Sequence, residues 1–286
     1  FQTWELGSRH GTFQAEKFKV DVSKTPVPRF DLLNFDNYLY IGVQYSRGCP
    51  FTCEFCDIIE LYGRVPRVKT NAQILAELDT LYQLGYRGHV DFVDDNFIGN
   101  KRALKTFLPE LTSWLRERAY PFEFTTEASI NLADDPELLK LMTDANFVGV
   151  FVGIESTDAE TLAVIRKKQN TRRSLADSIR RLYASGLYVK AGFILGFDTE
   201  KSTAADAIID LIEETAIPVC FVSLLFALPH TQLGRRLTHE GRFDWSLPES
   251  DTAGGDQCAH GLNFDTVRPK QQVVEQYRRD IERICE

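Results

Sequence analysis

Three cysteines lie within eight residues of one another, in the segment Cys49-Pro-Phe-Thr-Cys53-Glu-Phe-Cys56. Thiolates at this spacing, directly after a strand-like stretch, can hold one corner of a cuboidal iron–sulfur cluster, which normally takes four Cys ligands. The other three cysteines are scattered over the second half of the chain, so no fourth ligand is evident. We therefore predict a 4Fe–4S cluster with one open iron, where a substrate or cofactor could bind.

Two other kinds of metal site have different ligand patterns. A structural zinc site takes four ligands, commonly as two Cys-x-x-Cys pairs or with paired histidines. The chain has no second cysteine pair, and its five histidines show no ligand spacing. A bacterial ferredoxin would have a fourth Cys close by, followed by Pro. The spacing therefore favours the open cluster over a zinc-stabilised binding module or a non-catalytic electron carrier.

The composition is that of a folded protein, and the cysteine pattern, one local cluster and three scattered residues, indicates a reducing compartment. Hydrophobic residues make up 43% of the chain and charged residues 26%, as in globular proteins with a sizeable core. The net charge of −8 does not indicate a nucleic-acid partner. The longest apolar stretch, near residues 219–228, is about half of the roughly 20 residues that span a bilayer. We expect a cytoplasmic protein with no transmembrane segment and no nucleic-acid partner.

Strand-like and helix-like stretches alternate along the chain, and these elements must position the cysteines. Six strands are expected at residues 39–46, 89–94, 122–128, 148–154, 188–195 and 218–226. Helices are expected at residues 72–84, 102–118, 136–144, 159–165, 174–184 and 203–215. Such alternation predicts a parallel sheet covered by helices. An open doubly wound sheet fits the alternation as well, but no G-x-G-x-x-G follows the first strand.

The number of units favours a partial barrel. A full eight-fold barrel typically needs about 250 residues, whereas six units span about 190 residues here. The expected fold is α/β: a partial (β/α)6 TIM-like barrel at residues 39–232, with a mostly helical C-terminal extension at residues 233–286. Within that extension, residues 233–240 and 271–284 have helical spacing, and residues 244–268 are loop-like.

The cysteine motif, with the aromatic Phe55 directly before its last Cys, resembles the signature of the radical S-adenosylmethionine superfamily. The resemblance implies a six-unit partial barrel and a cluster whose open iron chelates the amino and carboxylate groups of S-adenosylmethionine. An electron from the cluster would then break the S–C5′ bond and yield a 5′-deoxyadenosyl radical. In such an enzyme the cofactor carries the chemistry, and the protein supplies orientation and exclusion of water.

By the same resemblance, carboxylates at strand ends would bind S-adenosylmethionine, because active sites of such barrels lie at the carboxyl ends of the strands. Asp94 and Asp95 stand where the family motif holds the amino group, although its usual form is Gly-Gly-Glu. Glu127 and Glu155 end the next two strands, and carboxylates accept hydrogen bonds from ribose hydroxyls or a cationic amine. Helix caps and solvated strand ends are the ordinary alternatives.

Two later segments are also similar to the family. Gly192-Phe-Ile194-Leu-Gly196 is similar to its G-x-I-x-G segment, where glycines let the backbone approach the adenine, so Gly192 and Ile194 are candidate cofactor contacts. The segment from Ala227 to Leu233 resembles a family turn, with His230 where many members have Gly. His230 is a candidate substrate contact, and a plain loop histidine is the alternative.

Three further stretches, at residues 25–32, 62–69 and 90–99, resemble cobalamin-dependent radical enzymes, the group that contains the hopanoid and bacteriochlorophyll methylases. Tyr62, Arg64 and Arg67 in the second stretch are candidate substrate or cobalamin contacts. Arg64, Arg67 and Lys69 could bind an acidic group on the substrate or cofactor, with a solvated basic loop as the alternative. Those relatives carry an N-terminal cobalamin-binding domain. Residues 1–38 are therefore expected to be the linker from such a domain, in a longer protein.

The implied reaction uses S-adenosylmethionine twice. One molecule gives the radical that removes hydrogen from an unactivated carbon, and another methylates cob(I)alamin, which passes the methyl group to the substrate radical. No general acid or base is needed at the carbon, so no catalytic side chain is predicted. Cyclisation or rearrangement by the same radical is the alternative. The implied partners are a small-molecule substrate, such as a lipid or tetrapyrrole, and an electron donor, such as flavodoxin or ferredoxin. A lipid substrate would bring the enzyme to a membrane.

Overall fold

The computed structural model describes residues 16–244 and 261–285. Its centre is a six-stranded sheet in which the strands follow the order β1-β4-β5-β6-β7-β8. Every neighbouring pair is parallel, which confirms the predicted α/β architecture and its partial TIM-like barrel. The strands are β1 (Ile41–Val43), β4 (Gly88–Phe92), β5 (Phe122–Glu127), β6 (Phe147–Glu155), β7 (Tyr188–Leu195) and β8 (Val219–Leu224).

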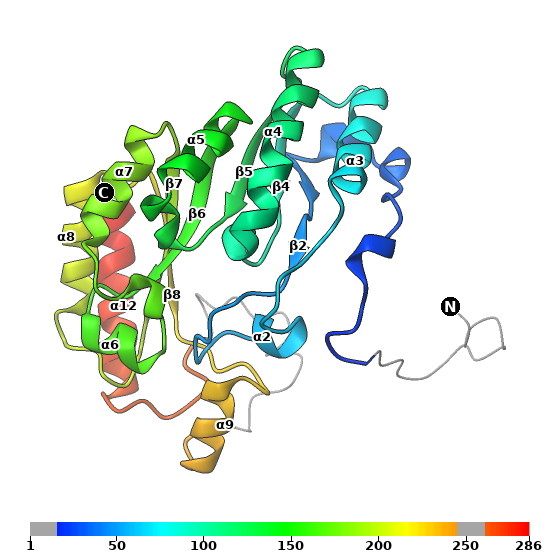
Figure 1. Ribbon diagram of the computed structural model, residues 1–286. Coiled ribbons are helices and arrows are strands. Elements are labelled where there is room, and N and C mark those ends of the chain that lie inside the picture. The colour runs from blue at the N-terminus through cyan, green and yellow to red at the C-terminus, as the bar shows by residue number, and fades with distance from the viewer. Residues whose placement is uncertain (1–15, 245–260, 286) are drawn as a thin grey trace.

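Helices connect successive strands and cover the outer side of the sheet (Figure 1). These helices are α3 (Asn71–Gln83), α4 (Lys101–Glu117), α5 (Pro136–Asp144), α6 (Ala159–Val164), α7 (Leu175–Ala184) and α8 (Ala204–Thr215). The C-terminal part is helical as predicted: α9 (Gln232–His239) follows β8, and α12 (Lys270–Cys285) packs against α8 (Figure 1). No helix within the described ranges is long and apolar enough to cross a membrane.

Local sequence signals set where several helices begin. Thr70 and Gln73 form a reciprocal capping box at the start of α3, which satisfies two backbone donors that a helix start leaves free. Asp135 caps α5 by accepting from the Leu138 backbone N–H at 3.1 Å, and Pro136 occupies its first turn. Short 3-10 turns join other elements: η1 (Val22–Lys24), η2 (Phe30–Leu32), η3 (Phe35–Asn37), η4 (Phe97–Asn100), η5 (Ile130–Asp134) and η6 (Lys168–Asn170).

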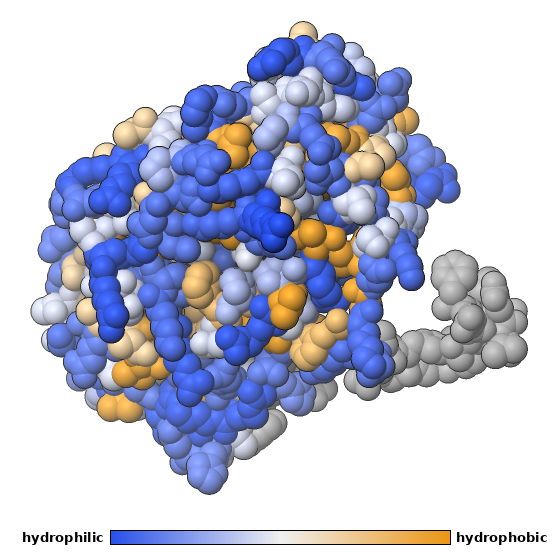
Figure 2. Space-filling model, in the orientation of Figure 1, coloured by the Kyte–Doolittle hydropathy of each residue, from blue (hydrophilic) through white to orange (hydrophobic). Residues whose placement is uncertain are grey.

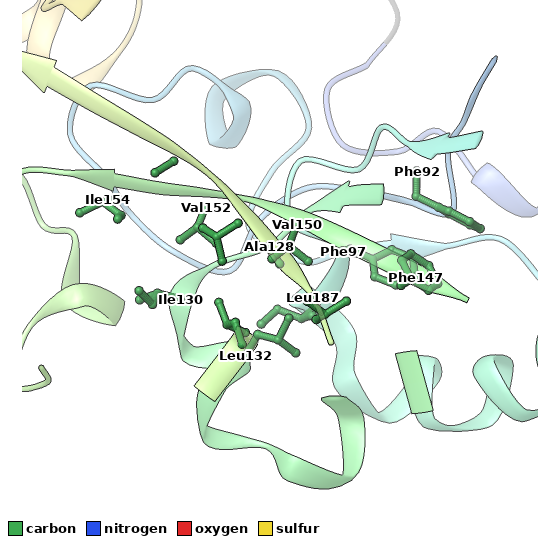
Figure 3. Close-up of a cluster of buried hydrophobic side chains, with 14 of the residues drawn as sticks. Phe92, Phe97, Ala128, Ile130, Leu132, Phe147, Val150, Val152, Ile154 and Leu187 are labelled. Carbon is green, nitrogen blue, oxygen red and sulfur yellow. The ribbon is translucent and has the colours of Figure 1, made fainter. Parts of the chain in front are cut away.

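The hydrophobic core lies between the sheet and its outer helices. Phe92, Phe97 and Phe147 meet in Figure 3, with ring centroids 5.2–5.4 Å apart. All three side chains are at most 2% exposed, and burying rings of this size stabilises the fold by about 1.5–3 kcal/mol each. On the face seen in Figure 2, hydrophilic side chains cover most of the surface. The helices therefore present a polar exterior and an apolar inner stripe.

The first predicted strand, at residues 39–46, is shorter in the structure. β1 ends at Val43, and β2 (Ser46–Arg47) instead pairs antiparallel with β3 (Arg67–Val68). The buried Asp94 carboxylate accepts from the Tyr45 backbone N–H at 2.9 Å and from Ser46, which draws this segment away from the sheet. The β2–β3 ribbon brackets the cysteine segment and α2 (Ile58–Leu61).

Two expectations fall partly outside the described residues. Most of the predicted loop at residues 244–268 lies outside the described ranges, but Phe264 within it forms an antiparallel bridge with Phe243, which precedes it. The first fifteen residues of the expected linker at 1–38 also lie outside the described ranges.

Candidate iron–sulfur and cofactor site

The three clustered cysteines line a single cavity of about 190 Å³ at the carboxyl ends of β5 and β6. Cys53 is buried, and Cys49 and Cys56 are partly buried. Burial raises the pKa of the Cys56 thiol to about 12 and that of Cys49 in the same direction. A metal must therefore supply positive charge for these thiols to act as thiolates, which are the form that binds iron. The lining is Cys49, Phe51, Cys53, Phe55, Cys56, Asp95, Asn96, Glu127, Ala128, Ser129, Phe151, Gly153, Glu155, Lys167 and Gln169.

A glycine turn starts the cysteine loop. Gly48 has a φ of +103°, and a Cβ added there would lie 2.9 Å from the carbonyl oxygen of Gly63. The Gly48 N–H donates to Asp95 Oδ2 at 2.8 Å, and the Cys49 N–H donates to the Gly63 carbonyl at 3.2 Å. Only glycine takes this conformation and close approach without strain, so the turn fixes where the first cysteine lies.

Two side-chain amides contact the thiol sulfurs. Asn96 Nδ2 lies 3.8 Å from Cys49 Sγ, and Gln169 Nε2 lies 3.6 Å from Cys53 Sγ. Hydrogen bonds to cluster sulfurs are one of the protein's controls on cluster potential. Neither amide was predicted from the sequence. Asn96 directly follows the Asp94-Asp95 pair, whereas Gln169, in η6, has no sequence signal.

A buried ion pair forms one wall of the cavity. Lys167 Nζ lies 2.6 Å from Glu155 Oε1, and both residues are 8% exposed. Burial lowers the pKa of Lys167, but the Glu155 carboxylate outweighs this effect and the net change is upward. Gly153 leaves room for the pair, because a Cβ there would lie 2.2 Å from Glu155 Oε1. Glu155 was singled out in the sequence, and Lys167 was missed.

Glu127 presents an unsatisfied oxygen. Its Oε2 atom is buried and has no hydrogen-bond partner among the described residues. Burial raises the pKa of the Glu127 carboxyl to about 7. A buried polar atom without a partner costs about 1–3 kcal/mol, so this oxygen is suited to accept a hydrogen bond from a bound ligand.

The two adjacent aspartates have different surroundings. Asp95 lines the cavity. Asp94 is 1% exposed and lies outside the lining, because its carboxylate binds the backbone before the cysteines, including Ser46. Burial raises the pKa of Asp94 to about 7. In this arrangement Asp94 fixes the route of the chain into the cysteine loop, and only Asp95 faces the cavity.

The other predicted contacts lie outside the cavity lining. Gly192 and Ile194 are on β7. Gly192 packs against the ring of Phe151, and a Cβ added at Gly192 would lie 2.8 Å from a ring carbon. Arg67 donates to the backbone carbonyls of Val20 and Tyr62. The remaining two, Arg64 and His230, are exposed. The structure thus brings together Cys49, Cys53, Cys56, Phe55, Asp95, Glu127 and Glu155, and leaves the basic loop and His230 apart.

The donor set suits a cluster better than a single ion. In the described part of the chain, no three His, Cys, Asp or Glu side chains are placed to hold one metal ion. A cuboidal cluster offers a separate iron to each thiolate, so its ligands need not converge on one point. Three cysteines, two amide donors to sulfur and an unsatisfied carboxylate oxygen therefore fit a cluster beside a polar cofactor.

Comparison with known proteins identifies the same region. The model of the Radical SAM superfamily matches residues 43–212. The chain is 51% identical over 273 residues to an uncharacterized methyltransferase of Synechocystis sp., covering 96% of this chain and 50% of that protein. It is 39% identical to the hopanoid C-2 methylase of Rhodopseudomonas palustris, covering 91% of this chain and 47% of that protein.

A solved structure has the same fold. The cobalamin-dependent S-adenosylmethionine radical enzyme OxsB superposes with a TM-score of 0.67 at 17% identity, over 91% of this chain and 44% of that chain. The chain spans about half the length of the curated relatives it matches.

Proposed function

Because the chain belongs to the radical SAM superfamily, we propose that the complete protein is a cobalamin-dependent radical methyltransferase acting on an unactivated carbon. Membership of the superfamily confirms the expected 4Fe–4S cluster and S-adenosylmethionine as cofactors. The observation that carries the proposal is the single cavity shared by Cys49, Cys53, Cys56 and the Glu155–Lys167 pair. This cavity supports the proposal because the three candidate ligands share it with side chains of both charges.

In this proposal the three cysteines would ligate a 4Fe–4S cluster and leave its fourth iron free for S-adenosylmethionine. Bound there, the cluster would supply the electron that cleaves S-adenosylmethionine. Asn96 and Gln169 would donate to the ligating sulfurs and hold them in place. The aromatic rings of Phe51, Phe55 and Phe151 line the same cavity and would exclude water from the reactive radical.

Charged and polar groups in the cavity match the two ends of S-adenosylmethionine. Its amino-acid end is a zwitterion, and the Glu155–Lys167 pair offers an anion and a cation within 2.6 Å of each other. The unsatisfied Oε2 of Glu127 would accept a hydrogen bond from a ribose hydroxyl. These residues would orient the cofactor, and none of them is needed as an acid or base.

Methyl transfer and cobalamin rest on the relatives. Two of them are a methyltransferase and a methylase by name, and the superposed structure is that of a cobalamin-dependent enzyme. We propose that another domain of the complete protein binds cobalamin, with residues 1–38 as the linker to it, 39–232 as the barrel and 233–286 as the C-terminal extension. A lipid or tetrapyrrole substrate and a flavodoxin- or ferredoxin-like electron donor complete the proposal.

Anaerobic reconstitution tests the radical chemistry. The reduced cluster should give an electron-paramagnetic signal that shifts on adding S-adenosylmethionine, and dithionite should yield 5′-deoxyadenosine. Cys53→Ala should abolish both. Cys220→Ala is the matched control, because this free cysteine lies on β8 outside the cavity lining. Retained cleavage in Cys53→Ala would contradict the ligand assignment.

Methyl transfer is tested on the full-length protein. Methylated product should form only when cobalamin is supplied. Product that forms without cobalamin, or that is cyclised and carries no new methyl group, would contradict the proposal while leaving the radical chemistry intact.

A further inference from the structure

The inner face of the sheet is unusually polar. Strands of a parallel sheet are normally apolar on both faces, since both are buried. Here β4 and β5 alternate, with apolar side chains such as Phe92 and Phe124 buried against the helices, although Thr126 takes one of these positions on β5. The opposite, inner positions carry polar and charged side chains: His89, Asp91, Glu123, Thr125 and Glu127. An inner face of this kind is suited to a polar ligand rather than to a dry core.

That inner face encloses a second cavity, of about 490 Å³. This volume is within the range of small-molecule sites, roughly 300–1,000 Å³. Glu127 and Phe151 line both this cavity and the cysteine cavity, so the two adjoin there. The lining is Tyr40, His89, Asp91, Thr125, Glu127, Phe151, Lys190, Phe221, Val222 and Ser223.

One wall of this second cavity is a hydrogen-bonded chain. The Thr125 hydroxyl donates to the Asp91 carboxylate, and His89 Nε2 lies 2.8 Å from the Thr125 oxygen. Because the Thr125 hydrogen is engaged by Asp91, His89 Nε2 must be the donor in its contact. His89 Nδ1 in turn lies 3.2 Å from Glu123 Oε1. The chain fixes Asp91 at the cavity wall before any ligand arrives.

The opposite wall is aromatic. The rings of Phe151 and Phe221 lie 5.9 Å apart, on β6 and β8. Phe221 is 55% exposed and Tyr40 is 50% exposed. They lie on or next to the two edge strands of the sheet. Exposed aromatic side chains around a cavity mark binding surface rather than core.

Ionisable side chains of both signs line the second cavity: Asp91 and Glu127 are acids, and His89 and Lys190 are bases. Lys190 pairs in register with Phe151, which pairs in register with Glu127, so cation and carboxyl stand two strands apart. Asp91 carries the opposite charge to Lys190, and burial raises the pKa of Glu127 to about 7. A neutral ligand is therefore favoured over an ion. Hydroxyl groups both donate and accept hydrogen bonds, so they can use the carboxylates and the ammonium together.

We propose that the barrel interior is the substrate site and that it binds the neutral, hydroxylated end of an amphipathic substrate. Asp91 and Lys190 bind the hydroxyls, and Phe151 and Phe221 contact the apolar side. The ligand's reacting carbon then lies toward Glu127, where the two cavities meet. The identification of this ligand as the substrate rests on the proposed function, whereas the binding site itself does not.

Alkyl probes of one chain length test the head-group preference. Octyl β-D-glucoside, octylammonium and octyl sulfate, each below its micellar concentration, are titrated calorimetrically into the reconstituted chain. The glucoside should bind at least tenfold more tightly than either ion. Equal or tighter binding of octylammonium or octyl sulfate overturns the proposal.

Variants locate the binding. Asp91→Asn and Phe221→Ala should each weaken glucoside binding at least fivefold, and Asp144→Asn, at the exposed end of α5, should leave it unchanged. The paramagnetic shift caused by S-adenosylmethionine should persist in Asp91→Asn, which shows that the barrel is folded. Glucoside binding that is equal in wild type and both variants overturns the site.

The two proposals fail separately. Loss of the paramagnetic shift in wild type, with selective glucoside binding retained, refutes the radical function and leaves the inner site standing. A normal shift together with non-selective probe binding refutes only the inner site.

Discussion

At the scale of single residues, the cysteine cavity depends on side chains that lie far from the cysteines in the sequence. Gln169 and Cys53 are 116 positions apart, yet the amide contacts the sulfur. Lys167 lies 12 positions from its partner Glu155. The Gln169 contact arises because the barrel closes around the cavity, whereas Glu155 ends β6 and Lys167 follows the next helix, α6.

Replacing Lys167 with Met should abolish binding of S-adenosylmethionine while destabilising the fold. Loss of one partner of a buried ion pair costs about 3–5 kcal/mol, because the Glu155 carboxyl, 8% exposed, would be left without its cation. The double variant Lys167→Met with Glu155→Gln should recover most of that stability, measured by urea unfolding, but not the paramagnetic shift. Lys168→Met, at an exposed neighbour, is the control. A normal shift in the double variant would refute the role of this pair.

Replacing Gln169 with Leu should lower the reduction potential of the cluster. A hydrogen bond to a ligating sulfur stabilises the more negative, reduced cluster, and this variant removes the donor that lies 3.6 Å from Cys53 Sγ. A redox titration followed by paramagnetic resonance measures the change, with Gln272→Leu on the exposed side of α12 as control. An unchanged or raised potential would show that the amide does not act on the cluster.

At the scale of elements, the cysteine loop is held from outside by α9. Arg236 Nε lies 2.6 Å from Glu54 Oε1, and its Nη1 lies 2.9 Å from Asp198 Oδ2. The Leu233 N–H also donates to the Glu54 carbonyl at 2.9 Å. Glu54 stands between two of the cysteines, so α9 determines where that part of the loop lies.

Arg236→Ala should therefore reduce cluster incorporation. The substitution leaves the Glu54 carboxylate, which is 8% exposed, without its cation. The unfolding free energy should fall by about 2 kcal/mol, less than for a fully buried pair, because the arginine is partly exposed. Iron and sulfide content after reconstitution measures the effect. Arg180→Ala removes a surface pair between α7 and α8 and should incorporate a full cluster. Equal iron content in the two variants would contradict a positioning role for Arg236.

Most elements could be predicted because their signals are local. The apolar stripe of α4 and the Asp135-Pro136 start of α5 are visible in the sequence. The short β1 could not be predicted, since its end depends on the Asp94 side chain 48 positions after Ser46. Within the site, the cysteine spacing and strand-end carboxylates were visible. Lys167 and Gln169 were not, because they lie in or beside a short turn without periodicity.

At the scale of the whole molecule, two buried acids lie where the C-terminal segment packs on the barrel. Glu200 accepts from the Gly196 N–H at 2.8 Å and lies 3.6 Å from Arg268. Asp280 on α12 is 2% exposed, and both of its carboxylate oxygens are buried without a hydrogen-bond partner among the described residues. Burial raises the pKa of Glu200 to about 7 and that of Asp280 to about 6.

These shifts set the sign of a pH dependence. The folded protein keeps protons on Glu200 and Asp280 that the unfolded chain releases near its ordinary carboxyl pKa of about 4. The unfolding free energy should therefore fall as pH rises from about 4 to about 7, and these two groups cause no further loss above that range.

Glu200→Gln keeps an acceptor for Gly196 but cannot ionise, so it should gain stability relative to wild type by about 1–3 kcal/mol between pH 5 and pH 8. Urea unfolding at the two pH values measures this gain, with the exposed Glu213→Gln on α8 as control. A constant difference between Glu200→Gln and wild type would show that Glu200 is already ionised in the folded protein, and that the docking of the C-terminal helix does not depend on its proton.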